Sequence, residues 1–145
     1  MTAKEYLQTV YNIKCRIDRL NERRKDLNDD LYSYGIQATD GNHVQTSVSG
    51  DRLSELIAMA DEVERKLVLE IKSLIQQKQV ISEQIEALPN EKYRRVLFER
   101  YILCKRWEQI ADGFHIRDVR WIYRLHGKAL QLFAKEWNLT IERPL

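Results

Sequence analysis

The sequence predicts an all-α protein, with a long antiparallel coiled-coil helical hairpin over residues 1–88 followed by a three-helix domain over residues 89–145. Only five glycines and two prolines in 145 residues favour long, uninterrupted helices. Apolar residues recur at heptad spacing in two stretches of the first part. Residues 1–87 hold 12 Lys and Arg against 15 Asp and Glu, whereas residues 88–145 hold 12 against 7. The second part is therefore basic, which suits a polyanionic partner.

The first helix is predicted over residues 2–34, with Thr2 and Glu5 spaced as an N-terminal capping box. Its apolar seam alternates spacings of three and four residues and has one polar member, Arg24. The seam comprises Tyr6, Val10, Ile13, Ile17, Leu20, Arg24, Leu27, Leu31 and Tyr34. Residues 35–50 contain three glycines and no helical period, so they are predicted to form a flexible loop.

A second helix is predicted over residues 51–88, with Ser49 or Asp51 as its N-cap and Pro89 just beyond its end. Its predicted seam comprises Leu53, Ile57, Ala60, Glu64, Leu67, Ile71, Leu74, Lys78, Ile81, Ile85 and Leu88. In an antiparallel hairpin that pairs Tyr34 with Leu53, the numbers of facing residues add up to about 87. Arg24 then lies opposite Glu64, and we predict an ion pair that fixes the register.

The second helix carries further apolar residues that one hairpin seam cannot cover. They are Leu56, Val63, Val68, Leu69, Ile75 and Val80. Either the C-terminal domain or a second copy of the chain must cover them, and a homodimer is the favoured interpretation.

Three helices are predicted after Pro89. Asn90 caps the first, which runs to about Leu103, and a short helix follows over residues 107–111. Residues 112–117 form a turn in which Gly113 supplies a left-handed residue. The long last helix has Asp118 as its N-cap and ends near Trp137. Its apolar face comprises Ile122, Leu125, Ala129, Leu132 and Phe133.

The opposite face of the last helix offers the donors that a helix needs for docking in the major groove of DNA. Arginine suits this task because its fork pairs with guanine or with phosphate. The candidate groove residues are Arg117, Arg120, Trp121, Tyr123, Arg124 and Lys128. Gly127 would let the backbone approach DNA closely. Flanking phosphates would be held by Arg94, Arg95, Lys105 and Arg106. The arginines of the last helix could instead form an ordinary solvated helix face. Trp107 is expected to belong to the core and not to contact DNA.

The second part of the chain resembles the promoter-reading C-terminal domain of bacterial sigma factors, which is a helix-turn-helix. The residues that carry this resemblance are Leu88-Pro89, Tyr93-Arg94-Arg95-Val96-Leu97, Arg100-Tyr101, Trp107-Glu108-Gln109-Ile110-Ala111 and Ala129-Leu130. Small phage regulators of ArpU type are similar in residues 1–7 and 121–130 as well. The turn over residues 112–117 is about one residue longer than the sigma pattern, and His115 stands where glycine is usual.

The resemblance implies a phage or prophage transcriptional regulator that binds specific double-stranded DNA, with late genes as targets and host RNA polymerase as a further partner. A DNA-packaging subunit similar to a small terminase subunit, and a protein-interaction module that does not touch DNA, are the alternatives. No nucleophile motif or phosphate-binding glycine loop is present, so we expect neither an enzyme nor a cofactor. Cys104, His115 and His126 match no common metal spacing. A cytoplasmic protein with reduced Cys15 and Cys104, not bound to a membrane, is expected.

Overall fold

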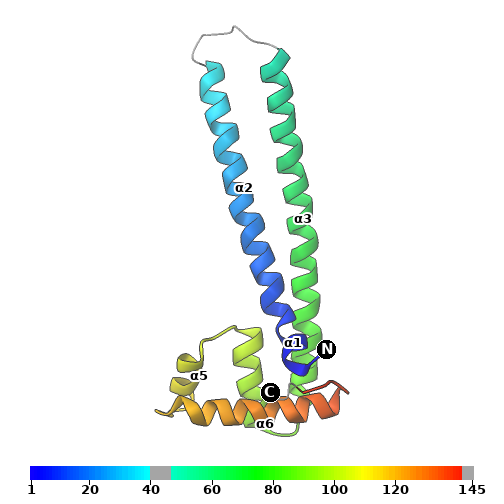
Figure 1. Cartoon of the computed structure of the whole chain (residues 1–145), viewed down its shortest axis with the longest axis vertical. Helices are drawn as coiled ribbons and strands as arrows, with labels where there is room; N and C mark the ends of the chain where they lie inside the picture. The colour runs from blue at the N-terminus through cyan, green and yellow to red at the C-terminus, as the bar shows by residue number, and fades with distance from the viewer. Residues whose placement is uncertain (40–46, 142–145) are drawn as a thin grey trace. The chain divides into compact units, whose positions relative to one another are not determined.

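The computed structural model describes residues 1–39 and 47–141, and the prediction of an all-α protein is confirmed. The helices are α1 (Ala3–Leu7), α2 (Thr9–Thr39), α3 (Ser47–Glu86), α4 (Glu91–Leu97), α5 (Trp107–Gly113) and α6 (Val119–Glu136), shown in Figure 1. A π-helical segment, η1 (Phe98–Ile102), continues α4. In the described part of the chain, the extended pairing consists of one isolated bridge, between Thr2 and Thr140.

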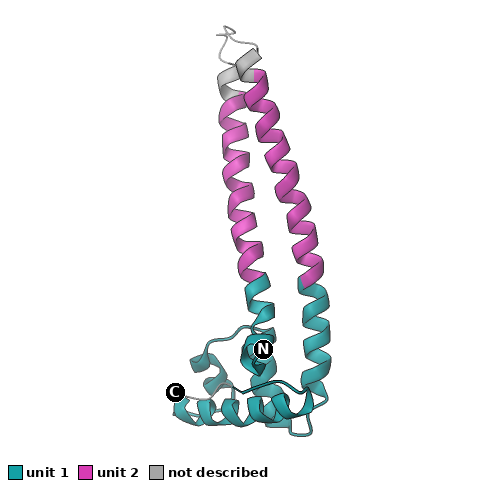
Figure 2. Cartoon of the chain, turned by 45° about the vertical axis from the view of Figure 1, so that its right-hand side comes forward, with its two compact units in different colours: residues 1–13, 74–145 teal, residues 14–73 magenta. Residues whose placement is uncertain are grey.

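The chain divides into two compact units, which Figure 2 distinguishes by colour. Unit 1 comprises residues 1–13 and 74–145, and unit 2 comprises residues 14–73. This division falls inside α2 and α3, whereas the sequence predicted a domain boundary between residues 88 and 89.

The N-terminal helix differs from the prediction of one helix over residues 2–34. The predicted capping box is confirmed, because Thr2 Oγ1 accepts from the backbone N of Glu5 at 3.1 Å and Glu5 Oε2 accepts from the backbone N of Thr2 at 2.9 Å. Gln8 then separates α1 from α2, and α2 continues to Thr39. The prediction was wrong at both points because heptad spacing continues unchanged through Gln8 and stops short of Thr39.

The predicted loop over residues 35–50 is helical at both of its ends. α2 includes residues 35–39, and α3 begins at Ser47, so neither Ser49 nor Asp51 is its N-cap. Glycine lowers helix propensity by only about 1 kcal/mol, and neither Gly35 nor Gly50 prevents helix formation. The centre of the predicted loop, residues 40–46, lies outside the described residues.

Unit 2 buries a different face of α3 from the one predicted. Leu27 of α2 packs with Leu56, Val63 and Leu67 of α3, and Ile17, Leu20 and Leu31 lie against this cluster. Ile57 and Ile71, both predicted in the seam, are 48% and 45% exposed. The predicted and the buried stripe share Leu67. They differ because Leu56 and Val63 lie one residue before the predicted Ile57 and Glu64, so helical spacing fits both stripes.

The two helices of unit 2 run antiparallel in the predicted register. Arg24 and Glu64 form the predicted ion pair, with Nη1 of Arg24 at 3.5 Å from Oε1 of Glu64. A second pair joins Nε of Arg16 to Oε1 of Glu70 at 3.0 Å. The numbers of the paired residues add up to 88 and 86, close to the predicted 87. Both pairs are partly exposed, so each stabilises the fold by at most about 1 kcal/mol.

The core of unit 1 combines the N-terminal residues with the C-terminal helices. α6 packs against α4, with α5 beside its first turns and α1 beside its second half (Figure 1). The buried residues are Ala3, Leu7, Val10, Ile81, Ile85, Leu88, Val96, Leu97, Tyr101, Ile102, Ile110, Ala111, Ile122, Leu125, Ala129, Phe133 and Ala134. The backbone N of Ala3 donates to the carbonyl of Thr140 at 2.9 Å, which ties α1 to the segment after α6.

The apolar residues of α3 that the predicted seam left over have two different fates. Leu56 and Val63 are buried within unit 2. The other four, Val68, Leu69, Ile75 and Val80, are exposed, so no described part of the chain covers them.

Candidate nucleic-acid interface

The end of α5 sets the direction in which the chain enters α6. The left-handed residue there is His115, with φ of 58°, and not Gly113 as predicted. Gly113 belongs to α5 as its last residue, and the backbone N of Ile116 donates to the carbonyl of Ala111 at 3.0 Å. This six-residue closure is a Schellman motif, in which the left-handed position usually carries glycine. Here His115 occupies it.

Asp118 begins α6 as predicted. Its side chain accepts from the backbone N of Arg120 at 3.0 Å, which satisfies one of the donors at the helix start. Ile122, Ala129 and Phe133 are fully buried, which fixes the rotation of α6 about its axis. The helix ends at Glu136 with Trp137 as its C-cap, which agrees with the predicted end near Trp137.

The opposite face of α6 is open to solvent and basic. A shallow depression at its N-terminal end is lined by Ile116, Arg117, Asp118, Arg120, Trp121 and Arg124. Lys128 lies one turn beyond Arg124 and is also exposed. Within the described residues, Arg117, Arg124 and Lys128 form no ion pair. The structure therefore brings together Arg117, Arg120, Trp121 and Arg124 of the predicted groove residues, with Lys128 one turn further. Tyr123, which was also predicted there, packs against Trp107 instead.

Arg120 differs from its neighbours because it has a carboxylate partner. Its Nε lies 3.3 Å from Oδ1 of Asp118, while its side chain remains 81% exposed. The hydrogen bond from the backbone N of Arg120, followed by the one from its side chain, holds the pKa of the Asp118 carboxyl below its usual value. Asp118 is therefore ionised at neutral pH.

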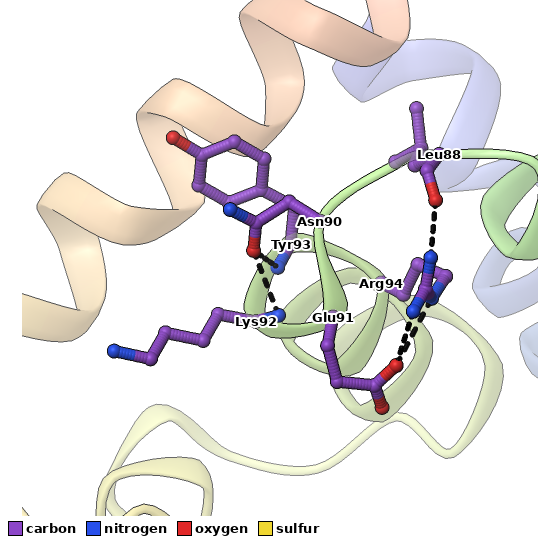
Figure 3. A network of polar contacts seen from close by, with 6 residues as sticks. All are labelled: Leu88, Asn90, Glu91, Lys92, Tyr93 and Arg94. Carbon is purple, nitrogen blue, oxygen red and sulfur yellow. Dashed lines mark hydrogen bonds and ion pairs between the residues drawn. The ribbon is translucent and has the colours of Figure 1, made fainter.

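Arg94, a predicted phosphate contact, is bound within unit 1 (Figure 3). It donates to the carbonyl of Leu88 at 2.5 Å and forms an ion pair with Glu91. Asn90, in the same network, accepts from the backbone N of Lys92 at 2.9 Å and so caps α4 as predicted. Arg94 thus connects the start of α4 with Leu88, in the turn that follows α3.

Arg95 and Lys105, two further predicted phosphate contacts, share one carboxylate partner. Glu99 in η1 is 9% exposed, with Oε1 at 2.9 Å from Nζ of Lys105 and Oε2 at 3.6 Å from Nε of Arg95. Arg95 also donates to the carbonyl of Gly113 at 2.6 Å and stacks on Phe114 at 4.0 Å. Arg95 thus connects η1 with the end of α5, and Lys105 ties the segment after η1 back to Glu99. Of the four predicted flanking cations, only Arg106 keeps a side chain without such a partner in the described residues.

The aromatic residues of the domain form a cluster behind the basic face. Trp107 packs against the core as predicted, with its ring edge-on to His126 at 4.6 Å and to Tyr123 at 5.3 Å. Tyr101 Oη and His126 Nε2 share a hydrogen bond of 2.7 Å. Burial, with smaller contributions from Arg100 and Lys4, lowers the pKa of His126 to about 4. The imidazole is therefore neutral at pH 7. The sequence pattern did not indicate that His126 would be buried and hydrogen-bonded to Tyr101.

Trp121 lies at the edge of the basic face. It is 37% exposed, with Phe114 at 6.3 Å between ring centres and Nζ of Lys92 at 5.7 Å from its ring. Lys92, in the first turn of α4, was not among the predicted site residues. It is brought there only by the packing of α4 against α6, a contact that sequence spacing does not encode.

Residues 37–133 match the family described as Protein of unknown function (DUF1492), and the chain belongs to this family. The match includes α3, α4, α5 and most of α6, and so the whole basic face. Neither a curated protein nor a solved structure matches the chain. Among the described helices, none has an apolar stretch of the length needed to cross a membrane.

Proposed function

We propose that this chain is a sequence-specific double-stranded-DNA-binding protein that regulates transcription in a phage or prophage, as an activator of late genes. The basic face of α6 carries the proposal, because Arg117, Arg120, Arg124 and Lys128 are exposed while the opposite face is buried in the core. A preceding short helix and a turn are the elements that a helix-turn-helix requires. The resemblance to ArpU-type regulators supports the phage context. As an activator, the protein would act in the cytoplasm and would also contact host RNA polymerase.

Binding to duplex DNA tests the proposal directly. We expect affinity to fall with rising salt concentration, with a log–log slope of about −0.9 for each phosphate that the protein contacts. Arg117→Gln with Arg124→Gln should reduce that slope by about 2 in magnitude. The matched control is Arg19→Gln with Arg52→Gln, which removes the same charge from exposed positions of unit 2. Absence of duplex binding at low salt would contradict the proposal and favour a protein-interaction module.

Self-association is the second part of the proposal. A second copy of the chain would cover the exposed apolar face of α3. Ile57, Val68 and Ile71 are exposed and share a heptad pattern with two polar members, Asp61 and Glu64, of which Glu64 pairs with Arg24. A dimer would present two copies of α6 to a two-fold DNA site.

Light scattering tests this association. We expect a dimer of the wild-type chain and a monomer of Val68→Glu with Ile71→Glu. Asn28→Glu with Ser33→Glu is the control, because it adds the same two charges at exposed polar positions of α2. A wild-type monomer would refute the association. A ring of about eight or more subunits would favour the DNA-packaging alternative.

A further inference from the structure

The pair formed by Asp118 and Arg120 distinguishes one arginine from the rest of the basic face. Oδ1 of Asp118 accepts both the backbone N–H of Arg120, at 3.0 Å, and its side-chain Nε–H, at 3.3 Å. One carboxylate oxygen thus caps the helix and restrains the arginine side chain in its first turn. Within the described residues, Arg117 and Arg124 have no carboxylate partner of this kind.

The atom through which Arg120 is held determines what it can bind. A guanidinium group presents five N–H donors in a rigid plane. Because Asp118 occupies Nε, the donors of Nη1 and Nη2 stay available on an 81% exposed side chain. Two terminal donors in one plane match O6 and N7 of guanine in the major groove, the commonest specific contact between a side chain and a base.

The sign of the charge on Asp118 argues in the same direction. A carboxylate on a surface that faces DNA repels phosphates and so lowers affinity for every duplex. An aspartate carboxyl is ionised at neutral pH even at its ordinary pKa, and the hydrogen bonds from Arg120 lower the pKa of Asp118 further. Asparagine would cap a helix about equally well without that repulsion. A carboxylate at this position stabilises the start of the helix and restrains Arg120, and it does not contribute to general DNA affinity.

We propose that Arg120 recognises a guanine in the major groove and that Asp118 is its positioning residue. This inference rests on the proposed function, since it names the base that a DNA-binding α6 would read. Arg117, Arg124 and Lys128 then serve as phosphate contacts.

The test begins with selection of bound sites from random duplex DNA by the wild-type protein. Each guanine of the selected site is then replaced in turn by 7-deazaguanine, which lacks the N7 acceptor. We expect one guanine whose replacement weakens wild-type binding several-fold. Changing that base pair altogether should cost about 5- to 150-fold.

Four variants identify the residue that reads this guanine. Arg120→Lys keeps the charge but loses the fork, so we expect the 7-deazaguanine effect at that position to disappear. Arg117→Lys and Arg124→Lys, the matched controls, should retain it. Asp118→Asn keeps the helix cap, and we expect it to weaken the 7-deazaguanine effect while raising affinity for unrelated duplexes. Thermal melting checks that each variant is folded.

The failures are distinguishable. Absence of duplex binding by the wild type refutes the proposed function and this inference together. Binding without any selected guanine, or loss of the 7-deazaguanine effect in Arg117→Lys or Arg124→Lys instead of Arg120→Lys, refutes the inference alone. An unchanged effect in Asp118→Asn refutes the positioning role and leaves Arg120 as the reader.

Discussion

Three residues that end helices hold their backbones in the left-handed region, and none of them is glycine. Cys104, His115 and Asn138 have φ values of 56°, 58° and 54°, and they follow η1, α5 and α6 respectively. A left-handed backbone costs a residue that carries a side chain about 1–2 kcal/mol. Ile116 and Leu139, which follow His115 and Asn138, pack against the core of unit 1. The preference of this conformation for glycine pointed to Gly113. Only the surrounding core decides that it is His115.

His126 gives the stability of unit 1 a pH dependence. Burial lowers its pKa to about 4, whereas an unfolded histidine titrates near 6.5. The unfolded chain therefore takes up a proton below pH 6.5 that the folded chain excludes. We expect the free energy of unfolding to be constant above that pH and to fall by about 2 kcal/mol between pH 7 and pH 5.

Chemical denaturation at a series of pH values measures this loss. His126→Gln keeps a hydrogen-bonding partner for Tyr101 and should flatten the dependence. The exposed His115 supplies the control, because His115→Gln should leave the dependence unchanged. An equal loss in wild type and His126→Gln would show that other groups cause it.

At the scale of elements, periodicity predicted where helices exist better than which face they bury. The apolar stripe predicted for α2 is the one that packs in unit 2, because α2 has few apolar residues outside this stripe. α3 is apolar on more than one face, so both Leu56 and Ile57 were candidates for burial against α2. The rotation of α3 about its own axis buries Leu56 and leaves Ile57 exposed. Helix caps at Thr2, Asn90 and Asp118 were predictable since each depends on a short local pattern.

A substitution at Gly127 in α6 tests the stability of the fold and the proposed DNA binding separately. A Cβ at this position would meet no atom within 4 Å, and alanine is the better helix former by about 1 kcal/mol. We expect Gly127→Ala to raise the melting temperature and to weaken duplex binding, because the added methyl group keeps DNA from the helix backbone. Gln131→Ala, on the same exposed face, is the control that adds no carbon. If Gly127→Ala binds duplex DNA with unchanged affinity, Gly127 does not serve to let DNA approach the helix backbone.

At the scale of the whole molecule, the candidate face was predictable and its surroundings were not. Spacing at 100° per residue identified the outward residues of α6. The internal partners of Arg94, Arg95 and Lys105 depend on contacts between helices, as does the position of Lys92 beside Trp121. The division into units was equally unpredictable, because residues 1–13 join a core that lies more than 60 residues further along the chain.

The shared core of unit 1 predicts that residues 89–145 do not fold alone. Leu7 is fully buried beside the C-terminal helices, and Leu7→Ala should cost about 2–5 kcal/mol. We expect the fragment 89–145 to lack a cooperative thermal transition by circular dichroism. Lys4→Ala, at an exposed position of α1, is the control. A fragment that melts cooperatively at the temperature of the full chain would restore the boundary at residue 88.

The contact between Trp107 and His126 has an optical consequence. Their ring centres are 4.6 Å apart, and a protonated imidazole ring quenches the emission of an adjacent indole far more than a neutral one does. Acid titration of the folded chain should therefore dim Trp107 as His126 gains its proton, while Trp121 and Trp137, each more than a third exposed, report on solvent. The intrinsic fluorescence of this protein thus contains its own gauge of the protonation state of a buried histidine.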